Sequence, residues 1–164
     1  MDAHFTVRAV VHENLNEILE LQKLSYRKEY WETKETFETM LNVYPKGCRV
    51  VFVDSKAVGY LFFHPSLEGK IQKLNYTSLK LTGKEDCMYL HDLSIHPDYR
   101  GKGITKFLLN YLNESTKEEG LHKQMLISVQ DSVLFWEKNG FEKVEFIKDY
   151  GGLPAYYMIK SLKY

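Results

Sequence analysis

Residues 96–112 read HPDYRGKGITKFLLNYL, in which two glycines stand directly before an amphipathic segment. The apolar side chains of that segment fall on one helical face: Ile104, Phe107, Leu108, Tyr111 and Leu112. Glycine ahead of a helix permits close approach to the unpaired N–H groups of the first turn, and these groups attract anions together with the helix dipole. One interpretation of residues 100–103 is therefore a phosphate-binding turn. The other is a plain turn in which Arg100 and Lys102 are solvated charges.

The flanking sequence predicts a mixed α/β domain built on one central sheet. Apolar, β-branched runs predict strands at residues 5–11, 49–53, 57–63, 88–95, 124–129, 141–147 and 154–162. Helical periodicity predicts one helix after Asn14, one ending at Pro45, one from Gly103 to Gly120 and a short one ending at Lys138. The expected order is β-α-α-β-β-β-α-β-α-β-β.

The segment before the strand at 88–95 is more polar. We expect Pro65 to end the strand at 57–63, because proline has no N–H group to donate to a sheet. Residues 66–86 contain four lysines and two glycines, which predicts an irregular excursion with some strand at 76–81. The sequence indicates no functional residue in this excursion.

Length, charge and cysteine content narrow the class of protein. A chain of 164 residues is expected to form one domain, residues 1–164. The 22 basic and 22 acidic residues cancel, so no overall field attracts nucleic acid or an anionic membrane. Cys48 and Cys87 belong to no ligand pattern, so we expect neither a disulfide nor a metal site. Because no long apolar run or signal peptide is visible, we expect a soluble, cytoplasmic protein.

A strand ending in LSI, the HPDYRGKGI turn, a helix, a further strand and FWEKNGF together resemble the GCN5-related N-acetyltransferase (GNAT) superfamily. The superfamily signature is Arg or Gln, two residues, Gly, one residue, then Gly or Ala, and it falls on Arg100, Gly103 and Thr105. Thr105 departs from it, and we expect its hydroxyl to add a hydrogen bond. The resemblance implies a GNAT-like single domain with a twisted, mostly antiparallel sheet of about seven strands flanked by about four helices. It favours the phosphate-binding interpretation.

The resemblance also implies the cosubstrate, acetyl coenzyme A, and no metal. The backbone N–H groups of residues 101–105 are expected to hold the pyrophosphate, and the main chain of residues 93–95 to pair with the pantetheine arm. The expected coenzyme-binding residues are Leu93, Ser94, Ile95, Arg100, Gly101, Lys102, Gly103, Ile104, Thr105 and Phe135.

Acetyl transfer to an amine needs a group that takes the proton of the amine. His91 is the predicted base, because imidazole titrates near neutrality and His91 stands two positions before Leu93. Its position is similar to that of a histidine in the arylalkylamine N-acetyltransferase branch. A structural histidine bonded inside the sheet is the other interpretation. Asp92 is the second candidate base, although strand alternation places it on the opposite face unless a bulge intervenes.

Many family members have a tyrosine acid where this chain has Trp136. Indole keeps its proton at ordinary pH, so either a distant tyrosine supplies the proton or the thiolate leaves without help from the protein. The candidate tyrosines are Tyr26, Tyr30, Tyr150, Tyr156 and Tyr157.

Tyr26, Tyr30 and Trp31 crowd together with charges between the first two helices. We predict that these three residues cover an aromatic or cationic acceptor. The alternative is that they close the bottom of the core.

The predicted function is acetyl coenzyme A-dependent N-acetyl transfer to a primary amine by direct attack on the thioester. The acceptor is expected to be a small molecule or a protein amino group, and the protein a monomer or homodimer. The missing tyrosine motivates an alternative, a non-catalytic acyl coenzyme A-binding module.

Overall fold

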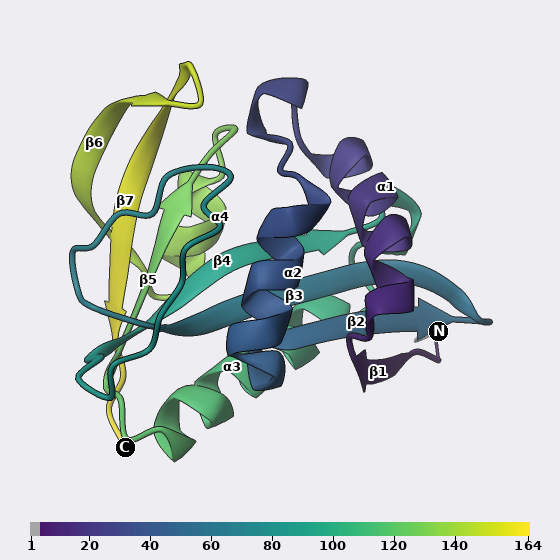
Figure 1. Ribbon diagram of the computed structural model, residues 1–164, viewed down its shortest axis with the longest axis horizontal. Helices are drawn as coiled ribbons and strands as arrows, with labels where there is room; N and C mark the ends of the chain where they lie inside the picture. Colours follow the sequence, from purple (N-terminus) through teal and green to yellow (C-terminus); the bar gives the residue numbers. More distant parts are fainter. Residues whose placement is uncertain (1–3) are drawn as a thin grey trace.

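The computed structural model describes residues 4–164. Its seven-stranded sheet has the order β1-β2-β3-β4-β5-β7-β6 and is antiparallel except between β4 and β5 (Figure 1). The strands are β1 (Thr6–Ala9), β2 (Cys48–Val53), β3 (Lys56–Ser66), β4 (Cys87–Ile95), β5 (Lys123–Ser128), β6 (Glu142–Tyr150) and β7 (Leu153–Ser161). The α-helices are α1 (Leu15–Ser25), α2 (Lys34–Val43), α3 (Ile104–Glu118) and α4 (Val133–Lys138). The expected element order and the mostly antiparallel sheet are confirmed.

Helices cover both faces of the sheet, because successive strand residues point to opposite sides. Val50 packs with the buried faces of α1 and α2, whereas its neighbour Val51 packs with α3 and α4. The two apolar clusters also contain Tyr60 and Leu61 of β3, one on each face. The central strands of the sheet are therefore buried on both sides.

The parallel strands β4 and β5 are paired over a short distance. The register joins residues 88–90 of β4 to residues 124–126 of β5. Beyond this point β4 continues to Ile95 with β3 as its partner. Among the described residues, the second half of β4 therefore has no strand partner on the β5 side, and a cleft opens there.

A β-bulge changes the direction of two side chains on β4. Phe62 pairs with Asp92 and Phe63 with Leu90, so His91 is the extra residue. Leu90 and Leu93 both pack in the α3 cluster, which puts His91 and Asp92 together on the α1 and α2 face. The expectation from strand alternation, that Asp92 faces away from His91, is wrong for this reason.

Two predictions about the middle of the chain are wrong. Pro65 does not end β3 but pairs with Met88 inside it, beyond Phe62, the last residue paired with β2. Such a one-sided edge tolerates a residue without an N–H group. Residues 76–81 contain no strand, because this segment crosses the α1 and α2 face as a loop and anchors it with single side chains such as Tyr76 and Leu79.

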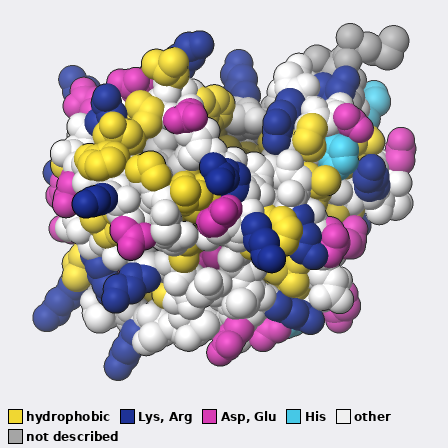
Figure 2. Space-filling model, turned by 90° about the horizontal axis from the view of Figure 1, so that it is seen from above, with side chains coloured by type: hydrophobic (Ala, Val, Ile, Leu, Met, Phe, Trp, Pro, Cys, Tyr) yellow, Lys and Arg dark blue, Asp and Glu magenta, His cyan; other side chains and the backbone are white. Residues whose placement is uncertain are grey.

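The surface carries charges of both signs, and both cysteines lie in the interior. Basic and acidic side chains are intermixed on the face shown in Figure 2. Cys48 and Cys87 are buried free thiols. Within residues 4–164 no helix is long and apolar enough to cross a membrane, and no group of three potential ligand side chains gathers to hold a metal ion.

Candidate active site

Two glycines shape the turn before α3. Gly101 and Gly103 have φ angles of 73° and 86°, a left-handed region that other residues rarely adopt, and Gly103 is the N-cap of the helix. A Cβ atom added to either glycine would meet nothing within 4 Å, so both border open space in front of the first helical turn. A side chain would fill this cradle, and the exposed N–H groups fit a phosphate there.

Arg100 fastens the cradle to the rest of the domain. Its Nε donates to the Ile95 carbonyl at 3.1 Å and its Nη2 donates to the Ser25 hydroxyl at 3.3 Å. The turn is therefore tied both to the end of β4 and to α1. The side chain of Ile104 is buried in the core, so its N–H group is the part available to the cradle.

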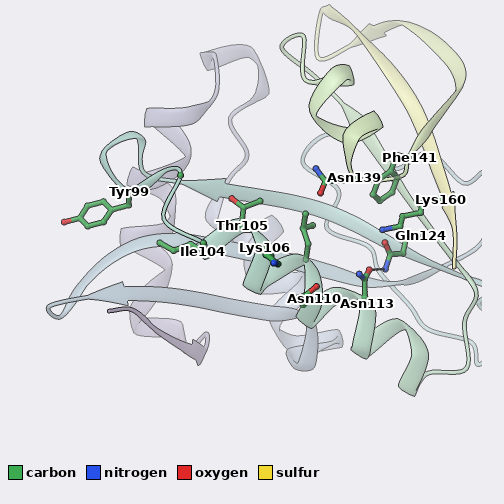
Figure 3. Close-up of a pocket in the computed structure, with 13 residues that line it drawn as sticks. Tyr99, Ile104, Thr105, Lys106, Asn110, Asn113, Gln124, Asn139, Phe141 and Lys160 are labelled. Atoms are coloured by element: carbon green, nitrogen blue, oxygen red, sulfur yellow. Dashed lines mark hydrogen bonds between the residues drawn. The ribbon is translucent and has the colours of Figure 1, made fainter. Parts of the chain in front are cut away.

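A cavity of about 600 Å³ extends from the cradle along α3 (Figure 3). Thr105, Lys106 and Asn110 of α3 line one side, and Phe141 and Lys160 line the other. Thr105 thus borders the cradle as expected, and Lys106 and Lys160 add positive charge. Lys102 is not among the described residues that line this cavity or the cleft beside it.

A second cavity of about 380 Å³ occupies the cleft between β4 and β5. Main chain and side chains of the second half of β4 line one wall, and the short helix α4 lines the other. The lining residues include Leu93, Ser94, Ile95, Arg100, Thr105 and Phe135, and also His91 and Asp92. The Ser94 hydroxyl donates to the Ser25 hydroxyl, so the main chain of Ser94 is what this residue offers to the cleft.

The side chain of His91 is 1% exposed and has a partner at each ring nitrogen. Its Nε2 lies 2.5 Å from Oε1 of Glu32, and its Nδ1 lies 3.4 Å from the Tyr76 hydroxyl. Burial lowers the pKa of His91, but the charge and hydrogen bond of Glu32 outweigh burial and raise the pKa above its ordinary value. Glu32 is itself held in place, since Gln22 exchanges two hydrogen bonds with its main chain.

Asp92 accepts hydrogen bonds from two tyrosines. The Tyr26 hydroxyl donates to Oδ1 at 2.7 Å, and the Tyr60 hydroxyl donates to Oδ2 at 2.8 Å. Burial raises the pKa of Asp92 to about 6, and His91 and the two hydroxyls only partly offset this effect. Asp92 is therefore a carboxyl group that changes charge close to neutral pH.

Tyr26 and Tyr30 border a third, open cavity of about 800 Å³. Its walls come from the α1–α2 connection, the β5–α4 loop and the β6–β7 hairpin, which includes Pro154 and Tyr156. Trp31 is not among its described lining residues: the indole N–H donates to the Tyr26 carbonyl at 2.7 Å, and Lys23 lies over the ring. The structure thus brings Tyr26 and Tyr30 to one cavity, while Trp31 braces the loop behind them.

A narrow cavity of about 40 Å³ shares two lining residues, Tyr26 and Tyr30, with the open one. It is lined by Tyr26, Tyr30, Glu32, Leu74, His91, Asp92, Ile127, Val129 and Tyr150. A space of this size holds a water molecule when polar groups surround it. The side chains of Glu32, His91 and Asp92 therefore border one small space, which shares Tyr26 and Tyr30 with the open cavity.

Trp136 stands in the cleft without a hydroxyl to replace the expected tyrosine. The side chain is buried and packs edge to face against Phe135 and Phe141. Of the five candidate tyrosines, Tyr26 borders the cleft, whereas Tyr157 is buried with its hydroxyl accepting from the Gly69 N–H group. Tyr30 and Tyr156 border the open cavity and Tyr150 the narrow one.

A family of known proteins matches the part of the chain that builds this site. The model of the acetyltransferase (GNAT) family matches residues 14–141, which is more than half of the chain. The chain belongs to this family. Membership of this family is what the glycine turn and the FWEKNGF stretch predict.

Two archaeal proteins are similar along most of the chain. An uncharacterised N-acetyltransferase of Methanocaldococcus jannaschii is 26% identical over 154 residues, which are 88% of this chain and 63% of the relative. An N-alpha-acetyltransferase of Saccharolobus solfataricus is 26% identical over 165 residues, which are 96% of this chain and 93% of the relative. This chain therefore spans less than two thirds of the first relative and nearly all of the second.

Solved structures share the fold. Ard1 from Thermoplasma volcanium superposes with a TM-score of 0.78 at 14% identity, covering 98% of this chain and 99% of that one. Arabidopsis thaliana Naa50, in complex with the bisubstrate analogue CoA-Ac-MVNAL, superposes with a TM-score of 0.71 at 18% identity, covering 96% and 99%. At these identities the likeness establishes the fold alone.

Several residues of the GNAT site were not predicted from the sequence. Glu32 and Tyr76 contact His91, and Tyr60 contacts Asp92, from three different parts of the chain. Glu32 lies among the charges of the α1–α2 connection, where no spacing distinguishes it from its exposed neighbours. Tyr76 lies in the polar excursion, where an isolated aromatic residue was the only available signal.

Proposed function

We propose that this GNAT domain transfers the acetyl group of acetyl coenzyme A to the nitrogen of a primary amine by direct attack on the thioester. The observation that carries the proposal is the 380 Å³ cleft, because one cavity reaches from Arg100 and Thr105 at the cradle to His91 and Asp92. A coenzyme laid along such a cleft has its phosphates at a helix N-terminus and its far end beside titratable groups.

The residues present fit coenzyme A. The cradle of residues 101–105 would hold the pyrophosphate, and the unpaired edge of β4 at residues 93–95 would bind the pantetheine arm as an added strand does. Phe135 of α4 would pack against it. When bound, acetyl coenzyme A supplies an acetyl group already activated as a thioester.

The chain itself must take a proton from the amine, since an alkylamine is almost wholly protonated at neutral pH. His91 is the base predicted from the sequence, and Asp92 is the second candidate. Both border the cleft and the narrow cavity, so a proton can reach either group through one water molecule. Burial of both groups keeps bulk water away from the proton transfer.

The acceptor is proposed to enter through the open cavity beside Tyr26 and Tyr30. Two observations support an amino group on a peptide or small molecule: the cavity is wide, at about 800 Å³, and it is lined by aromatic rings and by both Arg27 and Asp131. The similar protein of Saccharolobus solfataricus bears the name N-alpha-acetyltransferase, which further supports a terminal amino group.

Release of free thiol from acetyl coenzyme A, measured against a panel of alkylamines, amino acids and peptide N-termini, tests the proposal. We expect thiol release that depends on one class of amine. Gly103→Val, in which a branched side chain enters the cradle, is the matched control and should release none. Tight coenzyme binding with no amine-dependent thiol from the wild-type protein would instead support the non-catalytic acyl coenzyme A-binding module.

A further inference from the structure

A chain of hydrogen bonds fixes the proton positions behind His91, beginning at His64. His64 is fully buried, and its Nδ1 lies 2.8 Å from the Pro65 carbonyl, which can only accept. Nδ1 therefore carries a hydrogen. Burial lowers the pKa of His64 to about 4, so the ring is neutral at pH 7 and its Nε2 is an acceptor.

The Tyr76 hydroxyl lies between His64 and His91 and links their proton positions. Its hydroxyl lies 2.7 Å from His64 Nε2 and must donate its one hydrogen there. The oxygen is then an acceptor toward His91 Nδ1 at 3.4 Å, so Nδ1 of His91 also carries a hydrogen. Its Nε2 lies 2.5 Å from Oε1 of Glu32, and a hydrogen bond there needs a hydrogen on one of these two atoms.

Glu32 has a hydrogen-bond partner at each carboxyl oxygen. The Asn75 N–H group donates to Oε2 at 2.8 Å, so the oxygen not bonded to His91 also acts as an acceptor. Because the charge and hydrogen bond of Glu32 raise the pKa of His91, we assign the hydrogen of their contact to Nε2, which makes His91 an imidazolium between Glu32 and Tyr76. A ring with both nitrogens donating has no lone pair to receive a further proton.

Asp92, in contrast, has hydrogen-bond partners both as a carboxylate and as a protonated acid. As a carboxylate it accepts from Tyr26 and Tyr60. After protonation, its new O–H group can donate to the Tyr26 oxygen, because the Tyr26 hydrogen can turn to the Leu93 carbonyl at 3.1 Å. Tyr26 is thus placed to let Asp92 gain and lose a proton without leaving an unpaired buried group.

We propose that Asp92 takes the proton of the acceptor amine, and that His91 is a positioning residue held as an imidazolium by Glu32 and the Tyr76–His64 pair. The inference rests on the proposed function. An N–H bond of the ammonium breaks, its electron pair stays on nitrogen as the nucleophile, and an O–H bond forms on Asp92, by way of one water in the narrow cavity. The titratable groups around Asp92 are Tyr26, Glu32, Tyr60, His91 and Tyr150.

Nitrogen NMR of the wild-type protein labelled at histidine tests the proton positions without any turnover. At pH 7.5 we expect both nitrogens of His91 to carry hydrogen and His64 to be neutral with hydrogen on Nδ1. A bare ring nitrogen on His91 under these conditions would overturn the inference. This measurement stands even if no amine is acetylated, in which case the proposed function fails by itself.

Two matched variants then test the role in catalysis. Tyr60→Phe and Tyr76→Phe each remove one buried hydroxyl, the first from Asp92 and the second from His91. Loss of the Tyr60 hydrogen bond raises the pKa of Asp92, so the acidic limb of the kcat profile should move up by about one pH unit. Tyr76→Phe should leave that limb in place. With one amine used throughout, a shift in Tyr76→Phe, or in neither variant, would contradict the assignment.

Discussion

Trp136 departs from the family pattern, because it occupies the position of the expected tyrosine and still forms part of the cleft wall. The indole packs between Phe135 and Phe141 at the wall of the cleft, where a tyrosine was expected from the resemblance. Indole does not give up its N–H proton at ordinary pH, so we assign the residue a packing role. Under the proposed function, the leaving thiolate would take its proton from solvent or from a tyrosine elsewhere in the chain, and Tyr26 borders the same cleft.

Trp136→Phe tests this assignment, because it keeps a large ring and removes the N–H group. We expect turnover to change less than about tenfold, the effect of one modest interaction. Trp136→Tyr, which introduces a phenol, should raise turnover if departure of the thiolate limits the rate. A hundredfold loss in Trp136→Phe, with folding and coenzyme affinity retained, would show that the indole N–H acts in the transition state.

At the scale of an element, α3 and the turn before it form the part most clearly predicted by the sequence. The glycine spacing and the apolar stripe of the helix were both visible in a single window of sequence. In the structure Gly103 has a positive φ and borders open space. Such a feature can be predicted from sequence, because it depends only on the spacing of apolar residues and on glycine at positions of positive φ.

Gly103→Val tests the cradle in isolation. A branched side chain at a φ of 86° is strained and projects into the space before α3, so coenzyme A should no longer raise the melting temperature. Calorimetric titration of the folded variant gives the affinity directly. Unchanged coenzyme affinity in that variant would mean that the phosphates bind elsewhere.

The parts that sequence reasoning missed depend on contacts between elements. One extra residue in β4 reversed the side on which Asp92 lies, and a bulge leaves no local pattern in a strand that is apolar on both faces. Glu32 and Tyr76 reach His91 from loops 59 and 15 residues away in sequence. Loop residues follow no period, so their meeting with His91 could not be predicted from spacing.

At the scale of the whole molecule, the buried network makes stability depend on pH. Burial lowers the pKa of His64 from 6.5 to about 4. Between pH 4 and pH 6.5, His64 is therefore protonated in the unfolded chain and neutral in the folded chain. The contribution of His64 to stability therefore falls by up to about 3 kcal/mol as pH drops from 6.5 toward 4. Asp92, whose pKa is raised to about 6, contributes a slope of the opposite sign.

The contribution of His64 can be measured by comparing how the free energy of unfolding of the wild-type protein and of a His64 variant depends on pH. We expect His64→Gln, which replaces the ring with an uncharged amide, to lose less stability than the wild-type protein between pH 6.5 and 4. Urea unfolding at several pH values measures both proteins, and Asp92 affects them alike. Parallel loss of stability in the two proteins would contradict a neutral, buried His64.

The central claim, acetyl transfer to an amine within this cleft, is tested most directly by mass spectrometry of the acceptor after incubation with isotopically labelled acetyl coenzyme A. We predict that the label appears on the amine nitrogen in a one-to-one ratio with free coenzyme A, and that Gly103→Val produces none. Saturating coenzyme binding without labelled amine, across alkylamines, amino acids and peptide N-termini, would contradict the account.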